Sequence, residues 1–307
     1  MPTTPSLTDQ IATAAAKAAS VVAASTVTIG RDGRGTGIII GPNKVLTNAH
    51  NLRDRTTQIG FDGGRTAQAS LSAVDADGDL AVLDVDTASA VGLLWAEESP
   101  KQGDVVFAAS RTADGVRVAF GTVSAVGLSF RGPRGRLVNG SLEHTAPVMR
   151  GGSGGPLVDA AGRLVAINTH RIGRGFYLAL PGDSALKDRI AELAAGRSVE
   201  PRRLGVALAS SDVAAKLRRS VGLSERAGVL VRGVEVGSPA DAAGLREGDL
   251  IVKAGAVITT TTDDLHVALQ ALTGDEVVLT IVRGNDESTA TVRFTAEVAD
   301  RPGDAAS

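Results

Sequence analysis

The stretch RGGSGGPL, residues 150–157, places Ser153 between two pairs of glycines. Glycine lets the backbone turn sharply and lets a substrate approach closely, so such a turn can expose a hydroxyl beside free backbone N–H groups. Those N–H groups are the donors that stabilise an oxyanion during acyl transfer. The stretch alone fits three interpretations: such a nucleophile loop, the G-x-S-x-G elbow of an α/β-hydrolase, or a flexible glycine turn.

Two segments upstream of Ser153 decide between these interpretations. VLTNAH, residues 45–50, ends an apolar run on His50, and DGDLAVL, residues 77–83, begins another with Asp79. A serine hydroxyl needs a base, and the base needs an acid that fixes its tautomer. The chain order His, Asp, Ser is that of chymotrypsin, whereas α/β-hydrolases run Ser, Asp, His and would need a histidine further along this chain.

The strand pattern favours a mainly β fold. From Thr26 onward, short β-branched runs alternate with Gly, Asp and Asn about every ten residues, which is typical of antiparallel barrels or sandwiches. We predict a helical arm at 1–25, a protease domain at 26–196 with a closing helix at 183–195, a linker at 197–203, a second domain at 204–298 and a tail at 299–307. The second domain has predicted strands near 204–209, 228–236, 249–254 and 277–282, and predicted helices near 211–219 and 263–272.

Composition excludes several classes of function. The formal net charge is −2 and no basic run occurs, so we expect no nucleic-acid partner. The absence of cysteine excludes disulfides, thiolate metal sites and a cysteine nucleophile. The histidines lack metalloprotease spacing, and Asp75, Asp77 and Asp79 lack the rest of a calcium loop, so we expect no metal and no cofactor.

The start of the chain, MPTTPSLTDQ, lacks the basic residues and apolar core of a secretory signal. No apolar run reaches the roughly eighteen residues of a membrane span. With Met1 as the natural start we expect a cytoplasmic protein. A trimmed chain would leave a periplasmic, extracellular or membrane-tethered location open.

Together, TNAH, D-LAVL and GGSGGPL resemble trypsin-like proteases of the HtrA (Deg) type, and the resemblance covers nearly the whole chain. It implies a chymotrypsin-like double β-barrel and an ATP-independent serine endopeptidase that acts on unfolded or exposed segments in protein quality control. By the same resemblance His50 is the general base, Asp79 orients it and Ser153 is the nucleophile. Gly151, Gly152 and Ser153 would form the oxyanion hole.

The sequence also departs from this family. Gly152 stands where members often have Asn, and Thr145 where they have Asp. By the resemblance, Pro147, Thr169, His170 and Tyr177 line the substrate pocket, with Tyr177 in place of a usual glycine. Since Pro147 replaces any acid at the pocket base, we expect a small or medium apolar side chain before the cleaved bond. We interpret His144 as a structural histidine.

SPADAAGLREGDLI, residues 238–251, resembles the matching segment of PDZ domains, which are α+β. The resemblance implies that Arg203, Leu204, Gly205 and Val206 cup a peptide carboxylate and that His266 borders the groove. Expected partners are unfolded or misfolded proteins, peptide C-termini and copies of the chain, in a trimer. A catalytically silent PDZ-containing chaperone or scaffold is the alternative, kept open by the departures at Gly152 and Tyr177.

Overall fold

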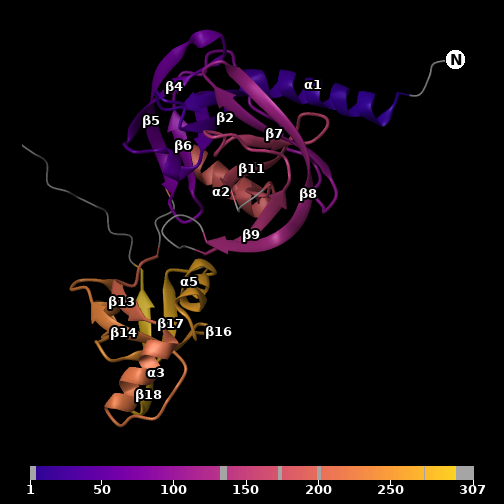
Figure 1. Ribbon diagram of the computed structural model, residues 1–307. Helices are drawn as coiled ribbons and strands as arrows, with labels where there is room; N and C mark the ends of the chain where they lie inside the picture. Colours follow the sequence, from indigo (N-terminus) through magenta and orange to yellow (C-terminus); the bar gives the residue numbers. More distant parts are fainter. Residues whose placement is uncertain (1–4, 132–136, 172–174, 199–201, 273, 295–307) are drawn as a thin grey trace, which may run out of the picture. The chain divides into compact units, whose positions relative to one another are not determined.

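The computed structural model describes residues 5–131, 137–171, 175–198, 202–272 and 274–294. The chain divides into two compact units, Met1–Pro201 and Arg202–Ser307, which we describe separately (Figure 1). The predicted tail at 299–307 lies outside the described residues.

The first unit contains a closed barrel in the neighbour order β1-β2-β3-β6-β5-β4. All its strand pairs are antiparallel, and β1 pairs with β4 to close it. Val27, Ile39 and Leu83 lie in its interior cluster. Its strands are β1 (Thr26–Ile29), β2 (Gly35–Gly41), β3 (Lys44–Thr47), β4 (Thr56–Gly60), β5 (Thr66–Asp75) and β6 (Leu80–Asp84).

A second closed barrel follows in the order β10-β11-β12-β9-β8-β7. Its longest strand, β8, has 17 residues and pairs with β9 through several bulges, which let a long strand bend around the barrel. The strands are β7 (Val105–Thr112), β8 (Gly115–Arg131), β9 (Leu137–His144), β10 (Pro156–Val158), β11 (Leu164–Arg171) and β12 (Tyr177–Pro181).

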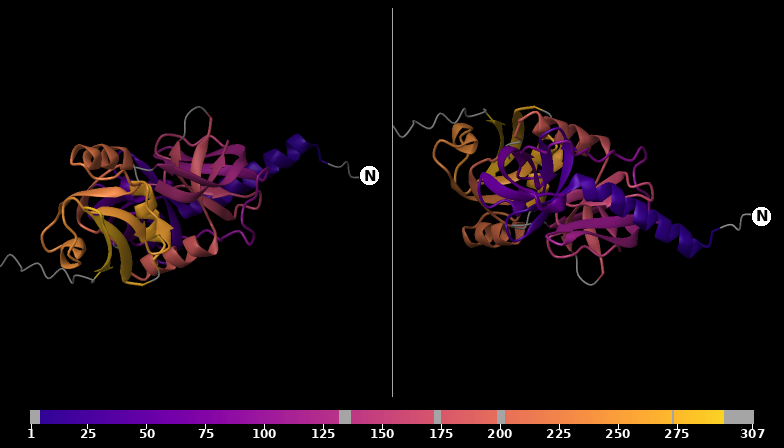
Figure 2. Two further views of the ribbon diagram at one scale, coloured as in Figure 1. Left: turned by 90° about the horizontal axis from the view of Figure 1, so that it is seen from below. Right: turned by 90° about the horizontal axis from the view of Figure 1, so that it is seen from above.

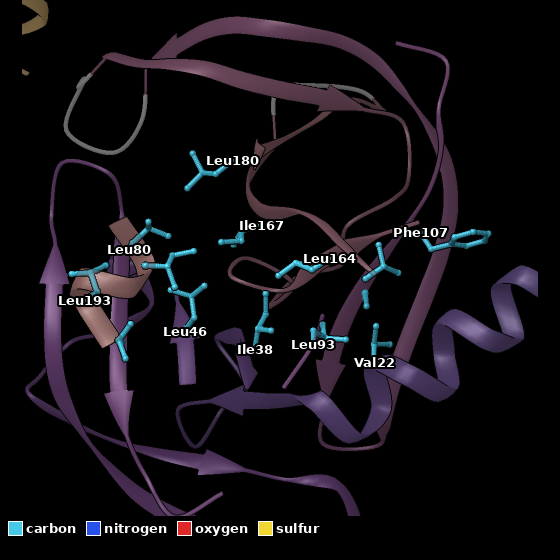
Figure 3. Packing of buried hydrophobic residues seen from close by; sticks show 14 of the residues in the cluster. Val22, Ile38, Leu46, Leu80, Leu93, Phe107, Leu164, Ile167, Leu180 and Leu193 are labelled. Carbon is cyan, nitrogen blue, oxygen red and sulfur yellow. The ribbon is translucent and has the colours of Figure 1, made fainter. Parts of the chain in front are cut away.

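One hydrophobic cluster joins the two barrels (Figure 3). Ile38 and Leu46 reach it from the first barrel, and Phe107, Leu164 and Ile167 reach it from the second. All five side chains are at most 1% exposed. This shared core fixes the barrels against each other, so side chains from both can be held at a common site.

In the described part of this unit, two α-helices pack on the barrels. Helix α1 (Leu7–Ser25) begins with a capping box, in which Ser6 and Asp9 exchange hydrogen bonds, and it buries Ala18 and Val22 in the shared cluster. Its N-terminal end extends away from the barrels (Figure 2). Helix α2 (Ser184–Ala194) is capped by Asp183.

The second unit is a sheet with helices against it. The strand order is β13-β14-β15-β17-β18, with β16 paired to β15, so β13 and β18 are edge strands. Its elements are β13 (Val206–Ala209), α3 (Ser211–Ser220), β14 (Val229–Val234), α4 (Pro239–Ala242), β15 (Leu250–Ala254), β16 (Val257–Ile258), α5 (Thr262–Gln270), β17 (Glu276–Arg283) and β18 (Asp286–Arg293). The predicted fold class, two barrels followed by an α+β domain, is confirmed.

Candidate active site

His50 follows shortly after strand β3 of the first barrel. The strand ends at Thr47, and a short 3-10 helix, Ala49–Asn51, carries the histidine. Its backbone N–H donates to Asp79 Oδ1 at 3.0 Å, and its Nδ1 lies 2.7 Å from Asp79 Oδ2. These contacts hold the imidazole in place. Its side chain is still 30% exposed, so part of the ring is open to a substrate.

Asp79 is held by a rigid turn. Its φ of 55° is left-handed, a conformation that Asp tolerates better than most residues. The turn is supported by buried Asp75, which accepts the N–H groups of Asp77 and Gly78 and pairs with Arg189 at 2.7 Å. Because an ionised carboxylate only accepts hydrogen bonds, Nδ1 of the neutral imidazole carries the proton and Nε2 is left as an acceptor.

Ser153 completes the arrangement from the second barrel. Its Oγ lies 2.8 Å from His50 Nε2, so the three residues predicted as a triad lie in one hydrogen-bonded chain. The same Oγ also lies 2.8 Å from Asn48 Oδ1 and 2.9 Å from the Thr169 carbonyl. One hydroxyl proton therefore has three acceptors within reach.

Asn48 and Thr169 support the chain of three, and sequence reasoning did not assign them this part. Asn48 is fully buried, and its Nδ2 donates to the Asp79 carbonyl at 2.9 Å, which turns its oxygen toward Ser153. Thr169 Oγ1 donates to Asp79 Oδ2 at 3.3 Å. Asn48 could have been found from the sequence, because it lies two residues before His50 in the motif TNAH. Thr169 was predicted only as a pocket residue.

The glycine loop leaves two backbone donors beside Ser153. The N–H groups of Gly151 and Ser153 donate to no other residue in the described part of the chain. The Gly152 N–H donates to the Met149 carbonyl at 2.9 Å, so this third residue of the predicted oxyanion hole has no N–H to offer. Gly151 has a φ of 83°, which explains the need for glycine there.

Gly152 is packed rather than loose. A Cβ added there would overlap Ser110 Oγ and lie 2.6 Å from Val148 Cγ1 and 3.0 Å from the Met149 carbonyl. An asparagine at this position would therefore require Ser110 and Val148 to shift.

Tyr177 and His144 form a buried stacked pair on β12 and β9. The ring centroids are 5.8 Å apart with a 25° interplanar angle, and Tyr177 is 8% exposed. His144 is fully buried, and neither ring nitrogen has a hydrogen-bond partner among the described residues. Burial lowers the pKa of His144 from 6.5 to about 4. The nearby polar groups of the Asn168 side chain and the Ala146 backbone oppose this shift, but they do not reach hydrogen-bonding geometry with the ring.

The other predicted pocket residues differ in exposure and in their contacts. Pro147 is exposed, and Thr169 is buried against Asp79. His170 belongs to β11, but its side chain lies outside the described residues. No three His, Asp or Glu side chains in the described ranges are grouped as metal ligands would be.

The second unit carries a groove of about 690 Å³ between β13 and α5. Its lining includes all the residues predicted for peptide binding, namely Arg203, Leu204, Gly205, Val206 and His266, and adds Leu265 and Leu269 from α5. Gly205 has a φ of 76°, and a side chain there would overlap Ser238. Since β13 is an edge strand, one side of the groove is an unpaired strand edge.

Comparisons with known proteins agree with this architecture. Residues 35–167 match the trypsin-like peptidase domain family, and residues 203–294 match the PDZ domain family. A probable periplasmic serine endoprotease DegP-like protein from Rickettsia prowazekii (strain Madrid E) is 28% identical over 86% of this chain and 53% of its own length. The mitochondrial serine protease HTRA2 of Drosophila pseudoobscura pseudoobscura is 31% identical over 81% of this chain and 63% of its own length.

The chain thus spans about half to two thirds of the length of these curated relatives. Among solved structures, the HtrA-type protease AlgW with a tripeptide is 27% identical, with a TM-score of 0.63 over 91% of this chain and 95% of that one. The serine endoprotease from Yersinia pestis shares the fold, with a TM-score of 0.68 over 95% and 99% at 24% identity.

No helix in the described ranges has both the length and the hydropathy needed to cross a bilayer.

The two domain families match in the same order, the relatives match along more than four fifths of the chain, and the double-barrel fold is shared. These findings show that this chain belongs to the HtrA-type, trypsin-like serine protease family with a C-terminal PDZ domain.

Proposed function

We propose that this chain is an ATP-independent serine endopeptidase with Ser153 as nucleophile, His50 as general base and Asp79 as the residue that orients it. The observation that carries the proposal is the continuous chain from Ser153 Oγ to His50 Nε2 at 2.8 Å and from His50 Nδ1 to Asp79 Oδ2 at 2.7 Å. We assign residues 26–196 to the peptidase domain and 204–298 to the PDZ domain.

In the first half-reaction, His50 Nε2 takes the Ser153 proton as Oγ attacks the carbonyl carbon of the cleaved peptide bond. The carbonyl π electrons move to oxygen, and the resulting oxyanion accepts hydrogen bonds from the N–H groups of Gly151 and Ser153. Asp79 stabilises the imidazolium that forms. When the C–N bond breaks, Nε2 returns the proton to the leaving amine and an acyl-enzyme remains.

In the second half-reaction, His50 takes a proton from water, and the hydroxide oxygen attacks the acyl carbon. The same two N–H groups hold the second oxyanion. Collapse of this intermediate breaks the bond to Ser153 Oγ, which recovers its proton from His50. The enzyme is restored and a peptide with a new carboxylate is released.

For the side chain before the cleaved bond, we propose small or medium apolar residues. Tyr177 is buried and stacked on His144, which fills volume where the family usually has glycine. Pro147 supplies no charge for a Lys or Arg substrate. His170 and Thr169 complete the proposed wall of this pocket.

We further propose that the PDZ groove binds peptide C-termini or exposed strands. The carbonyls of Leu204 and Gly205 are used inside the domain, by the N–H groups of Ala240 and Glu235. Their own N–H groups donate to no described residue and suit a terminal carboxylate, and Arg203 adds positive charge. The free edge of β13 can pair with the peptide backbone by β-augmentation.

Unfolded and misfolded proteins are the substrates that such a pair of sites would capture, in protein quality control. Assembly as a trimer and the cytoplasmic location stay predictions. The names of the relatives include a periplasmic and a mitochondrial protein, so they lend the cytoplasmic location no support. The silent chaperone remains the second candidate because Ser153 Oγ faces Asn48 and Thr169 as well as His50.

Denatured casein tests the proposal, with mass-spectrometric mapping of the products. We expect fragments from the wild type and from Ser99→Ala, an exposed serine of the same unit, and none from Ser153→Ala. The cleavage sites define the pocket preference, and cleavage mainly after Lys or Arg would contradict it. If all three proteins leave casein intact but prevent its aggregation, the chaperone is the correct reading.

A further inference from the structure

Thr36 contacts both sides of the nucleophile from the opposite barrel. It lies on β2 and is fully buried. Its Oγ1 donates to the Gly151 carbonyl at 2.7 Å, and its N–H donates to the Ser153 carbonyl at 2.9 Å. One residue of the first barrel therefore holds two carbonyls of the glycine loop in the second.

The direction of the Thr36 hydroxyl is fixed. Oγ1 accepts the backbone N–H of Arg111 at 3.0 Å, so its own proton is directed to Gly151. The Arg111 guanidinium is 3% exposed, ion-paired with Asp62, and donates to the Ala23 carbonyl near the end of α1 at 3.1 Å. These contacts anchor β7 at the point where its N–H meets Thr36.

The two carbonyls that Thr36 contacts belong to peptide groups whose N–H groups are hydrogen-bonded as well. In the plane after Gly151, the Gly152 N–H donates to Met149, and in the plane after Ser153, the Gly154 N–H donates to the Asn168 carbonyl at 2.8 Å. The single plane between them carries the Ser153 N–H, one of the two proposed oxyanion donors. Fixing its neighbours fixes the direction of that N–H.

We propose that Thr36 is a positioning residue for the oxyanion hole, and that Arg111 couples it to Asp62 and the end of α1. The hydroxyl of Thr36 keeps the glycine loop in the shape in which the N–H groups of Gly151 and Ser153 face a developing oxyanion. The catalytic part of this inference rests on the proposed endopeptidase activity. The structural part, a hydroxyl that orders the loop, does not.

Thr36→Val tests the hydroxyl, because valine keeps the shape and removes both hydrogen bonds of Oγ1. Thr36→Ser is the matched control, because it keeps the hydroxyl. With a peptide substrate cleaved by the wild type, we expect Thr36→Val to lower kcat about 10- to 100-fold while KM stays within about twofold. Thr36→Ser should remain within about threefold of the wild-type kcat.

Amide hydrogen exchange over residues 149–155, measured in a Ser153→Ala background, gives a readout that does not need activity. We expect exchange of this segment to accelerate about tenfold or more in Thr36→Val and to stay unchanged in Thr36→Ser. If Thr36→Val does not fold, Thr36→Cys, with a weaker hydrogen-bonding group, takes its place under the same criteria.

An unchanged kcat and unchanged exchange in folded Thr36→Val overturn the inference, and so does an equal loss in Thr36→Ser. If the wild type cleaves nothing, the proposed endopeptidase fails. The exchange measurement then still decides whether Thr36 orders the loop.

Discussion

Mild acid should destabilise the first unit through His144. The imidazole is fully buried, without a hydrogen-bond partner among the described residues, and its pKa is lowered to about 4. In the unfolded chain it returns to the ordinary 6.5. Between these values the unfolded chain binds a proton that the folded chain does not, so the free energy of unfolding falls as the pH decreases below about 6.5 and levels off below about 4.

The size of the loss follows from the two pKa values. Each unit between them is worth about 1.36 kcal/mol, which gives a full loss of about 3 kcal/mol and about 2 kcal/mol on going from pH 7.5 to pH 5. His144→Phe keeps an aromatic ring against Tyr177 and removes the titration. The variant should therefore be less sensitive to this pH change by about 2 kcal/mol.

Urea unfolding at pH 7.5 and 5.0, followed by tryptophan fluorescence, measures this difference. Trp95 is the chain's one tryptophan and packs against the core of the first unit, so the signal reports that unit. A Ser153→Ala background prevents self-digestion, and the other histidines are common to both proteins. His266→Phe, in the second unit, is the control that should change nothing. An identical loss with and without His144 would refute the reasoning.

Three further results are expected. Gly152→Ala should lower the free energy of unfolding of the first unit by about 1–3 kcal/mol, measured by urea unfolding, and should reduce casein cleavage, measured by product mapping. Adding Ser110→Gly to this variant should restore part of the stability and part of the cleavage, because it removes the side chain that the new Cβ would overlap. Gly205→Ala should weaken binding of a C-terminal peptide at least about tenfold by calorimetry, because its Cβ overlaps Ser238 at a φ of 76°; unchanged binding would place the peptide elsewhere. Tyr177→Gly should admit larger side chains before the cleaved bond, and an unaltered set of casein cleavage sites would exclude Tyr177 from the pocket.

The sequence predicted what short motifs encode. The helical arm predicted at 1–25 is α1, and the strands predicted near 228–236, 249–254 and 277–282 agree with β14, β15 and β17 to within about two residues. Strands β4, β9, β10, β16 and β18 were missed. TTQIG and DESTATVR are too polar, LVNGSLEH is interrupted by glycine, and PLV is too short, so their pairing is decided by neighbouring strands rather than local preference.

In the site, too, motifs were predictable from the sequence and packing was not. His50, Asp79 and Ser153 stand in recognisable motifs, and the structure brings them within hydrogen-bonding distance. The sequence shows Gly152 where the family often has asparagine, but only the structure shows that Ser110 and Val148 fill the adjacent space. Such packing joins residues far apart in the chain, and no local pattern reveals it.

His50 and Asp79 lie on the first barrel and Ser153 lies on the second. This division determines when, during synthesis, the three residues can come together. The first barrel, which leaves the ribosome first, contains the proposed base His50 and its orienting acid Asp79 but not the proposed nucleophile Ser153. Ser153 lies on the second barrel, so its contact with His50 requires both barrels to be folded against their shared core. A chain in which only the first barrel has been made therefore lacks the proposed nucleophile and should not cleave its neighbours or its own unfolded segments.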